Sequence, residues 1–484
     1  VIYIYFTADG IFIKAVRQIG GKMIKKIVTF LMAAVLLLGT LTGCRSDIKN
    51  VEVVKLDPNN PIAITVWHYY NGAQQAAFDR LVSEFNATVG KEQGIYVEGK
   101  SQGSVSDLEQ AVTDAIEGKV GAEDVPNIFA SYSDLAYTAL NTVGLADLTR
   151  YFTQDDIDKY VEGYIREGYL NNGEALYLFP TAKSTEITMI NETAWEPFAE
   201  RTGVTKDMLL THEGIVEVAK KYYEWSGGKA FYGRDSMANY FVIGMKQLGT
   251  EIFQVTGDGV KLNADKEKIR RLWDNWYVPT VKGWFASYGR FRSDDVKTGD
   301  IIAYTGSSSS SMYFPDCMET AEGSESIDYD ILNAPIFDGG ENVKVQQGAG
   351  MAVTKSDTAH EYAACVFLKW FTETENNYKF VCESSYMPVT KESHSVQALD
   401  KALNDNNLEI NQKAYDCLKM VISHDEGCEY YTASAFANGM AARKVLDYNL
   451  SDKAKADLEE INAKVAAGRT REEAVAPYIT DEAF

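Results

Sequence analysis

Serine residues at two places in the sequence could carry covalent chemistry. Gly99-Lys100-Ser101-Gln102-Gly103 matches GxSxG, the pattern that holds a nucleophilic serine between a strand and a helix in α/β-hydrolases. Residues 306–314 read GSSSSSMYF and place five hydroxyl groups in a row. A serine from either stretch could act as a nucleophile only if a histidine and a carboxylate lay beside it in the fold.

The sequence does not specify these partners. Asp147 or Asp156 could serve as the acid and His212 or His360 as the base, but no motif singles them out. Short motifs such as GxSxG also arise by chance, and a glycine-containing loop that opens a helix would explain this one. A glycosidase would need two carboxylates, and no pair stands out among the 69 acidic residues. A secreted serine hydrolase using Ser101 stays as an alternative, and no residue is assigned as catalytic.

The serine run allows three interpretations: a flexible linker, a nucleophile site, or a patch of hydroxyl and backbone N–H groups that holds a polar ligand. Serine-rich composition favours a linker. However, the run lies between GDIIAY and Met312-Tyr313-Phe314, which both look like structured chain, and no base is specified nearby. These observations disfavour the linker and the nucleophile site, and the first serines could cap a following helix. A resemblance to a known family, carried by stretches along the whole chain, implies that the run lies at a strand end that faces a ligand.

Metal, cofactor and nucleic-acid chemistry find no support in the composition. The cysteines form no CxxC pair, the five histidines are isolated, and GxxxxGK[ST] is absent from the sequence. The formal net charge of −22 repels nucleic acid. We expect neither a metal site nor a cofactor, and no nucleic-acid partner.

The amino-terminal region has the order of a secretory lipoprotein signal. Lys25 and Lys26 follow Met23, residues 27–38 are apolar, and Leu41-Thr42-Gly43-Cys44 resembles the bacterial lipobox. This pattern predicts a signal peptide over residues 1–43, with Met23 as the true start, and lipidation (a palmitate-type acyl group) at Cys44. Residues 44–60 would form the tether. A retained membrane anchor is the alternative.

Strands and helices alternate after the tether. Strands are expected at 62–70, 94–98 and 126–130. A helix with an apolar stripe of Phe78, Leu81, Val82 and Phe85 is expected after the first strand, and a second helix from about residue 106 after the second strand. This alternation predicts a parallel sheet covered by helices, in which ligands lie beyond the carboxyl ends of the strands. Residues 187–342 form a second α/β unit by the same criteria, and the chain after 395 is mostly helical.

The order of these pieces resembles a known family. The stretches ITVW, AFDRLVSEFN, LYLFPTAKSTEITMINETAW, GDIIAYTGSSSSS, QGAGMAVTK and SSYMPVTK follow one another as in extracellular solute-binding proteins of ABC importers. The similarity is to the branch that holds maltodextrin- and glycerol-3-phosphate-binding proteins, and it covers nearly all of residues 61–478.

The resemblance implies a two-lobed α/β fold of the type II periplasmic-binding-protein kind, with a ligand cleft between lobes joined by crossing strands. The first lobe would comprise residues 61–182 and 345–390, and the second residues 187–342 and 391–484. Hinge closure would enclose the ligand.

Ligand-binding residues follow from the resemblance and from strand ends. Ser184, Ser308, Gly348 and Tyr386 match residues that contact ligand in the family, and Arg443 matches a phosphate-contacting arginine. We add Trp67 and Tyr69, whose rings could stack on a sugar, and Ser104 in the loop after the second strand. Two positions depart from the family pattern: Val105 replaces an aromatic residue, and Ala130-Ser131 stands where an acidic residue is expected.

The expected function is therefore that of a monomeric, lipid-anchored receptor on the extracellular face of a bacterial cell membrane. It would capture a carbohydrate, either an oligosaccharide or a polyol-type solute, and deliver it to the membrane permease subunits of an ABC transporter without catalysis. Glycerol 3-phosphate or a glycerophosphodiester is the alternative ligand within the same family.

Overall fold

The computed structural model describes residues 2–7, 10–15, 51–256, 259–320, 323–424 and 427–484. Residues 1–50 form one compact unit and residues 51–484 another. In the first unit, β1 (Ile2–Thr7) and β2 (Gly10–Ala15) pair as an antiparallel hairpin. The expected signal sequence after Met23 and the lipidation site Cys44 lie outside the described residues.

The first sheet of the larger unit has the strand order β4-β3-β5-β16-β6. Its parallel part comprises β3 (Ile62–His68), β4 (Ile95–Ser101) and β5 (Ile128–Ser131), which agree with the three expected strands. The strand β16 (Gly350–Val353) pairs antiparallel with both β5 and β6 (Leu178–Phe179), so β6 runs in the same direction as the parallel strands. The sheet is therefore mixed, because the chain enters β16 in the opposite direction when it returns from the second half of the fold.

Helices cover this sheet because their apolar stripes face it. The four residues of the predicted stripe, from Phe78 to Phe85, are buried in α2. In α4, Leu108 and Val112 are buried. The helices of this half are α2 (Gly72–Ala87), α3 (Val89–Gln93), α4 (Val105–Ile116), α5 (Ser133–Leu140), α6 (Gln154–Ile157), α7 (Glu162–Glu167), α13 (Thr358–Phe371) and α14 (Thr374–Ser384).

A second sheet has the order β14-β7-β11-β8. In it β7 (Glu186–Asn191) runs antiparallel to β11 (Ala303–Ser307) and β14 (Tyr329–Asn333), and β8 (Tyr232–Arg234) runs parallel to β11. Its helices are α8 (Glu192–Thr202), α9 (His212–Trp225), α10 (Met237–Gln247), α11 (Lys266–Val281) and α12 (Arg292–Lys297). We call the half built on the first sheet the first lobe and this half the second lobe.

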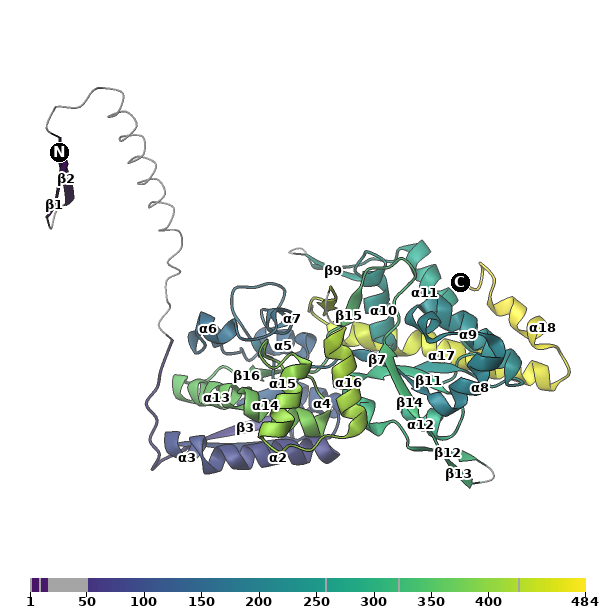
Figure 1. The fold of residues 1–484 in the computed structure, drawn as a ribbon, viewed down its shortest axis with the longest axis horizontal. Coiled ribbons are helices and arrows are strands. Elements are labelled where there is room, and N and C mark those ends of the chain that lie inside the picture. Colours follow the sequence, from purple (N-terminus) through teal and green to yellow (C-terminus); the bar gives the residue numbers. More distant parts are fainter. Residues whose placement is uncertain (1, 8–9, 16–50, 257–258, 321–322, 425–426) are drawn as a thin grey trace. The chain divides into compact units, whose positions relative to one another are not determined.

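The remaining elements lie outside the two central sheets (Figure 1). They are the strand pair β15 (Val343–Val345) and β17 (Glu429–Tyr431), the hairpins β9 (Phe253–Thr256)/β10 (Gly259–Leu262) and β12 (Cys317–Thr320)/β13 (Gly323–Ser326), and the helices α15 (Val396–Asp405), α16 (Gln412–Ser423), α17 (Gly439–Ala466) and α18 (Arg471–Val475). The long helix α17 packs against α10 and α11 and also contacts α5 of the first lobe. It therefore connects the two lobes along one side.

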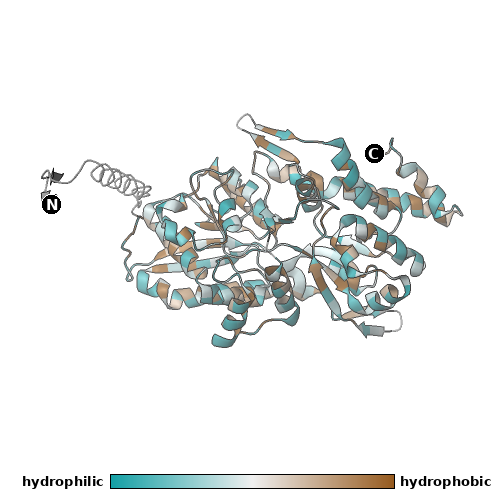
Figure 2. Ribbon diagram, turned by 45° about the horizontal axis from the view of Figure 1, so that its top comes forward, coloured by the Kyte–Doolittle hydropathy of each residue, from teal (hydrophilic) through white to brown (hydrophobic). Residues whose placement is uncertain are grey.

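Hydropathy follows this layering. Figure 2 shows helices that carry both hydrophilic and hydrophobic residues, as expected for helices with one exposed and one buried side. One hydrophobic core fills the first lobe and reaches Ile187, Met189 and Tyr304 of the second sheet. A separate core, which includes Trp195, Phe231 and Trp276, fills the rest of the second lobe.

Candidate functional site: a polar cleft between the lobes

Chain segments cross between the two lobes at one place. Ser184 and Gln347 exchange backbone hydrogen bonds of 2.9 and 2.8 Å, and Lys183 and Met387 exchange bonds of 3.2 and 2.6 Å. The amide of Ser308 donates to the carbonyl of Thr185 at 2.7 Å. The crossing is thus a short set of antiparallel pairs that can bend without opening either sheet.

A cleft lies beside this crossing. It has a volume of about 470 Å³ and is lined by both lobes. The first lobe contributes Val105, Ser106, Glu109, Tyr132, Ser133 and Asp134, and the crossing contributes Val345, Gln346 and Gln347. The second lobe contributes Ser236, Ala238, Asn239, Val242, Ile243, Tyr431, Thr432, Ala433, Met440, Arg443, Lys444, Asp447 and Tyr448. A volume of this size suits a ligand of a few sugar rings.

The first-lobe lining comes from the loops and helix starts that follow two parallel strands. Ser106 and Glu109 lie in α4 just after β4, and Tyr132 to Asp134 follow β5 directly. This is the edge at which the sequence predicted a ligand, because the carboxyl ends of parallel strands leave a crevice there.

Amide groups in the crossing point to a polar ligand. The Oε1 atoms of Gln346 and Gln347 are buried and have no hydrogen-bond partner within the described residues. Gln346 donates through Nε2 to Glu167, which holds its amide in place. The lining residue Asn239 of α10 is held likewise, by donating through Nδ2 to Glu186 at 3.0 Å. Buried acceptors without partners are costly unless a ligand or water donates to them.

A second cavity of about 260 Å³ adjoins the cleft, with Ser133, Gln346 and residues 431–433 in both linings. Its other residues include Arg166, Glu167 and Asn171. Glu167 forms a buried ion pair with Lys183 at 2.6 Å, and Lys183 Nζ also donates to the carbonyl of Gly348 at 2.8 Å. The crossing is thus held by charge as well as by backbone pairing.

A tyrosine cluster lies behind the cleft. The hydroxyls of Tyr69 and Tyr386 are 3.2 Å apart, and the amide of Ala349 donates to Tyr69 at 3.3 Å. Burial raises the pKa of Tyr69, Tyr132 and Tyr386 above the usual value, so all three stay protonated and can donate hydrogen bonds. Of the three, only Tyr132 lines the cleft.

The structure gathers most of the predicted ligand residues around the crossing. Ser184 accepts a hydrogen bond from Ser307 at 3.3 Å through its hydroxyl, and Ser308 Oγ accepts from the amide of Thr185 at 3.1 Å. Gly348 follows Gln347 and has φ +84°, where a Cβ would lie 2.5 Å from the carbonyl oxygen of Ala182. Ser184, Ser308 and Gly348, like Tyr69 and Tyr386, are buried beside the cleft and are not among the residues that line it.

The other three predicted residues lie apart from this group. Arg443 lines the cleft and donates through Nε to Asp134. Ser104 caps α4 by accepting from the amide of Asp107 at 3.1 Å, next to the lining residue Val105. Trp67 is buried in β3, with Lys100 Nζ 5.8 Å from its ring centre. The roles of all eight residues in ligand binding stay predictions.

The serine run lies at the end of β11, as the sequence predicted, and continues as a 3-10 helix over Ser308–Tyr313. The expected cap is absent: Ser307 makes no side-chain cap bond, and Ser310 Oγ instead donates to the Ser307 carbonyl at 2.6 Å. The hydroxyls of residues 307–310 bind backbone groups and other serine hydroxyls.

Sequence reasoning missed several lining residues. Ala130-Ser131 was taken to replace an expected acidic residue, but Asp134 lies only three residues further on and is 3 % exposed. A scan of the whole loop after the third strand would have found it. Asn239, Asp447 and Tyr448 carry no local signal, since they belong to helices that reach the cleft only through the second lobe's packing.

Ser101 has the contacts of a structural residue. Its hydroxyl donates to the carbonyl of Tyr70 at 2.7 Å and accepts from the amide of Gly103 at 3.2 Å. His68 is its neighbour across β3 and β4, but His68 Nδ1 accepts from the Tyr70 amide at 3.2 Å. His212 is buried against Tyr240 and Phe337 in the second lobe, and His360 pairs with Asp357. Neither histidine considered from sequence contacts Ser101.

Within the described residues there is no group of three metal-ligating side chains and no helix long and apolar enough to cross a membrane. Cys365, Cys382 and Cys417 are buried thiols, and burial raises the pKa of Cys382 and Cys417 to about 12. Buried thiols of this kind are inert packing residues.

Two α/β lobes, a short crossing and a polar cleft between them define a two-lobed solute-binding protein, which confirms the predicted fold class. The model of the bacterial extracellular solute-binding protein family matches residues 80–407, and the chain belongs to that family. Its members are extracellular binding proteins. No curated protein matches the chain.

Several solved structures share this fold at low sequence identity. UgpB from Mycobacterium tuberculosis in complex with glycerophosphocholine has a TM-score of 0.62 and 16% identity, over 84% of this chain and 100% of that one. The substrate-binding protein Lmo0181 from Listeria monocytogenes in complex with cycloalternan has a TM-score of 0.61 and 17% identity, over 86% and 97%. The lacto-N-biose complex of the galacto-N-biose-/lacto-N-biose I-binding protein from Bifidobacterium longum has a TM-score of 0.60 and 17% identity, over 83% and 93%.

Proposed function

We propose that this protein is the receptor of an ABC importer and captures an extracellular carbohydrate, either an oligosaccharide or a polyol-type solute, without catalysis. The cleft of about 470 Å³ carries this proposal, because it combines partnerless amide oxygens with tyrosine rings and lies between two lobes. Hydroxyl groups can donate to such oxygens, and aromatic rings suit the apolar faces of pyranoses. Similar folds that bind cycloalternan and lacto-N-biose support the same ligand class.

Delivery to membrane permease subunits and attachment through an acyl group at Cys44 complete the proposal. Cys44 lies outside the described residues, so the lipobox in the sequence is its support. A monomer suffices, since each chain contains a whole cleft. We assign the first lobe to residues 61–182 with 345–390, and the second to 187–342 with 391–484.

Glycerophosphodiesters are the alternative ligand, favoured by the glycerophosphocholine complex of similar fold. A serine hydrolase is the alternative of another class, and the contacts of Ser101 give it no support.

A thermal-shift and calorimetric screen of the full-length protein tests the proposal. Maltotriose, cycloalternan, lacto-N-biose and glycerophosphocholine serve as probes. We expect at least one neutral glycan to raise the melting temperature and to bind without being consumed. Stabilisation by glycerophosphocholine alone would favour the alternative, and turnover of a glycan or ester would contradict the proposal.

Gln347→Ala provides the matched variant. Its side chain lines the cleft while its backbone makes the crossing, so truncation removes the ligand contact and leaves the pairing with Ser184. We expect about tenfold weaker binding, equivalent to about 1.4 kcal/mol. Gln412→Ala, on the exposed start of α16, is the control and should bind as the wild type does.

A further inference from the structure

Several positively charged or electropositive groups border the cleft. They include the side chains of Arg443 and Lys444 and the amino-terminal end of α10, whose first turn contains the lining residues Ala238 and Asn239. Each could attract an anion, because a guanidinium, an ammonium group and a helix amino terminus all favour negative charge. Whether they recognise an anionic ligand depends on what already faces them.

Arg443 is neutralised by Asp134. The pair joins α17 to the first turn of α5, so it also bridges the two lobes. Asp134 is 3 % exposed, and its Oδ1 lies so close to Gly439 that a Cβ on that glycine would be 2.2 Å away. The carboxylate is therefore fixed between Arg443 and the first turn of α17. A phosphate would have to compete with it for the guanidinium.

The amino-terminal end of α10 is occupied by Asp447. This carboxylate accepts from the amide of Ala238 at 2.6 Å and from the hydroxyl of Ser236 at 3.4 Å. Burial raises the pKa of Asp447, and the hydrogen bond from Ala238 partly offsets that effect. The helix end thus carries its own anion, supplied by the neighbouring helix α17.

Lys444 and Glu109 both line the cleft. Burial raises the pKa of Glu109, and the charge of Lys444 acts in the opposite direction. The charged lining residues are therefore Glu109, Asp134, Asp447, Arg443 and Lys444, three acidic and two basic. Arg443 and the amino-terminal end of α10 each contact a carboxylate, and the acidic lining residues outnumber the basic ones by one.

We infer that the cleft selects an uncharged polyhydroxyl solute and rejects anionic ones, including phosphate esters and uronic acids, and that Asp134 and Asp447 determine this specificity. The inference rests on the proposed function, in that the cleft is the solute site. An anion would meet carboxylates that cannot move away, and like charges brought together in an interface are strongly unfavourable. Neutral hydroxyls can both donate to these carboxylates and accept from their partners.

Inorganic phosphate and glycerol 3-phosphate are the probes, used on the full-length protein at low ionic strength and pH 7. We expect neither to change the melting temperature of the wild type. Asp447→Asn keeps an oxygen acceptor for Ala238, and Asp134→Asn keeps the shape of that side chain. Each variant, and the double variant above all, should gain affinity for both probes by about tenfold or more.

Asp452→Asn is the matched control, because it removes a negative charge from an exposed position on the same helix. It should leave the response to phosphate unchanged. Adding Arg443→Gln to the double variant should abolish the gained affinity for phosphate. The reason is that the guanidinium released from Asp134 is the expected phosphate ligand. Tight binding of either probe to the wild type, or equal gains in the control, would overturn the inference.

The neutral-glycan screen distinguishes failure of the specificity from failure of the proposed function. Glycan binding together with wild-type phosphate binding would overturn the specificity and leave the proposed function standing. Loss of both glycan binding and any phosphate response in the variants would remove the proposed function and the inference together.

Discussion

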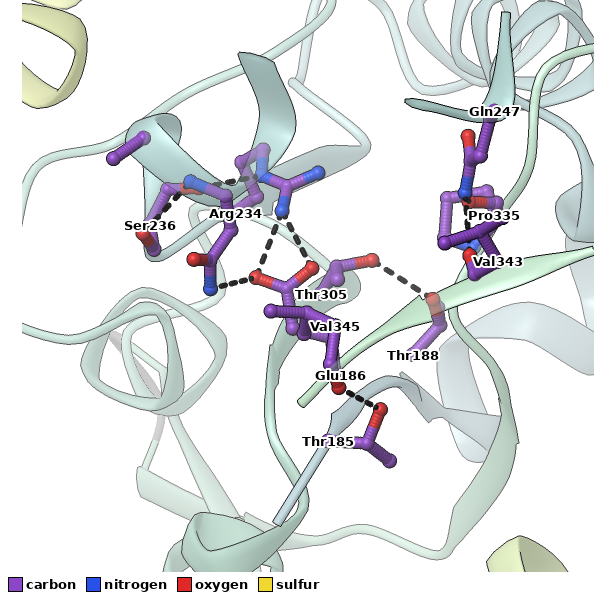
Figure 3. A network of polar contacts seen from close by, with 12 residues as sticks. Thr185, Glu186, Thr188, Arg234, Ser236, Gln247, Thr305, Pro335, Val343 and Val345 are labelled. Atoms are coloured by element: carbon purple, nitrogen blue, oxygen red, sulfur yellow. Dashed lines mark hydrogen bonds and ion pairs between the residues drawn. The ribbon is translucent and has the colours of Figure 1, made fainter. Parts of the chain in front are cut away.

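The carboxylate of Glu186 accepts two hydrogen bonds from a single nitrogen of Arg234, Nη2, at 2.9 and 2.8 Å (Figure 3). Both side chains are less than a tenth exposed. Arg234 also donates through Nε to the carbonyl of Ser236 at 3.1 Å, and Asn239 donates to Glu186. This pair therefore holds the start of α10, and with it two lining residues of the cleft, against the second sheet.

Arg234→Met should destabilise the protein by about 3–5 kcal/mol, because it leaves the buried carboxylate of Glu186 without its cation. It should also weaken glycan binding by displacing Asn239. Urea unfolding measures the first effect and calorimetry the second. The control is Lys221→Met, which breaks an exposed pair with Glu217 and should cost less than about 1 kcal/mol. A loss for Arg234→Met as small as the control's would show that the pair is solvated.

Gly348→Ala should destabilise the crossing by about 2 kcal/mol or more. Its φ of +84° disfavours a side chain, and the new Cβ would lie 2.5 Å from the carbonyl oxygen of Ala182. Gly121→Ala separates the two causes, because Gly121 has φ +87° and open space around it. That control should lose only about 1 kcal/mol in urea unfolding. Equal losses of stability in the two variants would mean that the backbone of the crossing shifts to accommodate the new methyl group.

Stability should fall as the pH drops from about 6.5 to about 4, because burial lowers the pKa of His68 from 6.5 to about 4. In that range the unfolded chain binds a proton that the folded protein does not, so the free energy of unfolding rises with pH. The shift corresponds to a loss on the order of 3 kcal/mol on acidification. Burial also lowers the pKa of His212, which adds a loss of the same sign.

His68→Asn should flatten this pH dependence, since an amide oxygen can replace Nδ1 as acceptor for the Tyr70 amide and does not titrate. Unfolding by urea at pH 4.5 and pH 7 measures the slope. His424→Asn, at an exposed position, should keep the wild-type slope. An unchanged slope in His68→Asn would assign the acid sensitivity to other groups.

Hydrophobic periodicity predicted helices and strands well where a single apolar face of the element packs on its neighbour. The stripe from Phe78 to Phe85 is buried because α2 has a single apolar face on the first sheet. The crossing could be expected only through the family resemblance, since the paired residues Ser184 and Gln347 are 163 positions apart in the sequence. No local pattern marks such a pair.

Charge matching in the cleft was beyond sequence reasoning for the same reason. Asp134 and Arg443 lie 309 residues apart, and each alone looks like a surface charge. Arg443 was predicted as a phosphate ligand from its place in the family pattern. The structure gives it an internal carboxylate, so a residue can keep its family position while its partner changes the ligand that it can serve.

Tyr448 should act as a stacking residue at the rim of the cleft. It lines the cleft and is 61% exposed, whereas the predicted stacking residues Trp67 and Tyr69 are buried. Tyr448→Ala should weaken binding of a neutral glycan such as maltotriose by about tenfold, the upper end of what one ring contact contributes. The melting temperature of the free protein should not change, because an exposed ring contributes little to folding. Calorimetric titration measures the affinity.

Two further variants distinguish stacking from other causes. Tyr448→Phe keeps the ring and should keep the affinity. If the hydroxyl group made the contact instead, Tyr448→Phe would bind as weakly as Tyr448→Ala. Tyr288→Ala removes an equally exposed ring, 64% accessible, that is not among the cleft residues, and should bind as the wild type does. Unchanged affinity in Tyr448→Ala would place the sugar deeper in the cleft, against Tyr132 and the amides of the crossing. In that case Gln347→Ala should still weaken glycan binding.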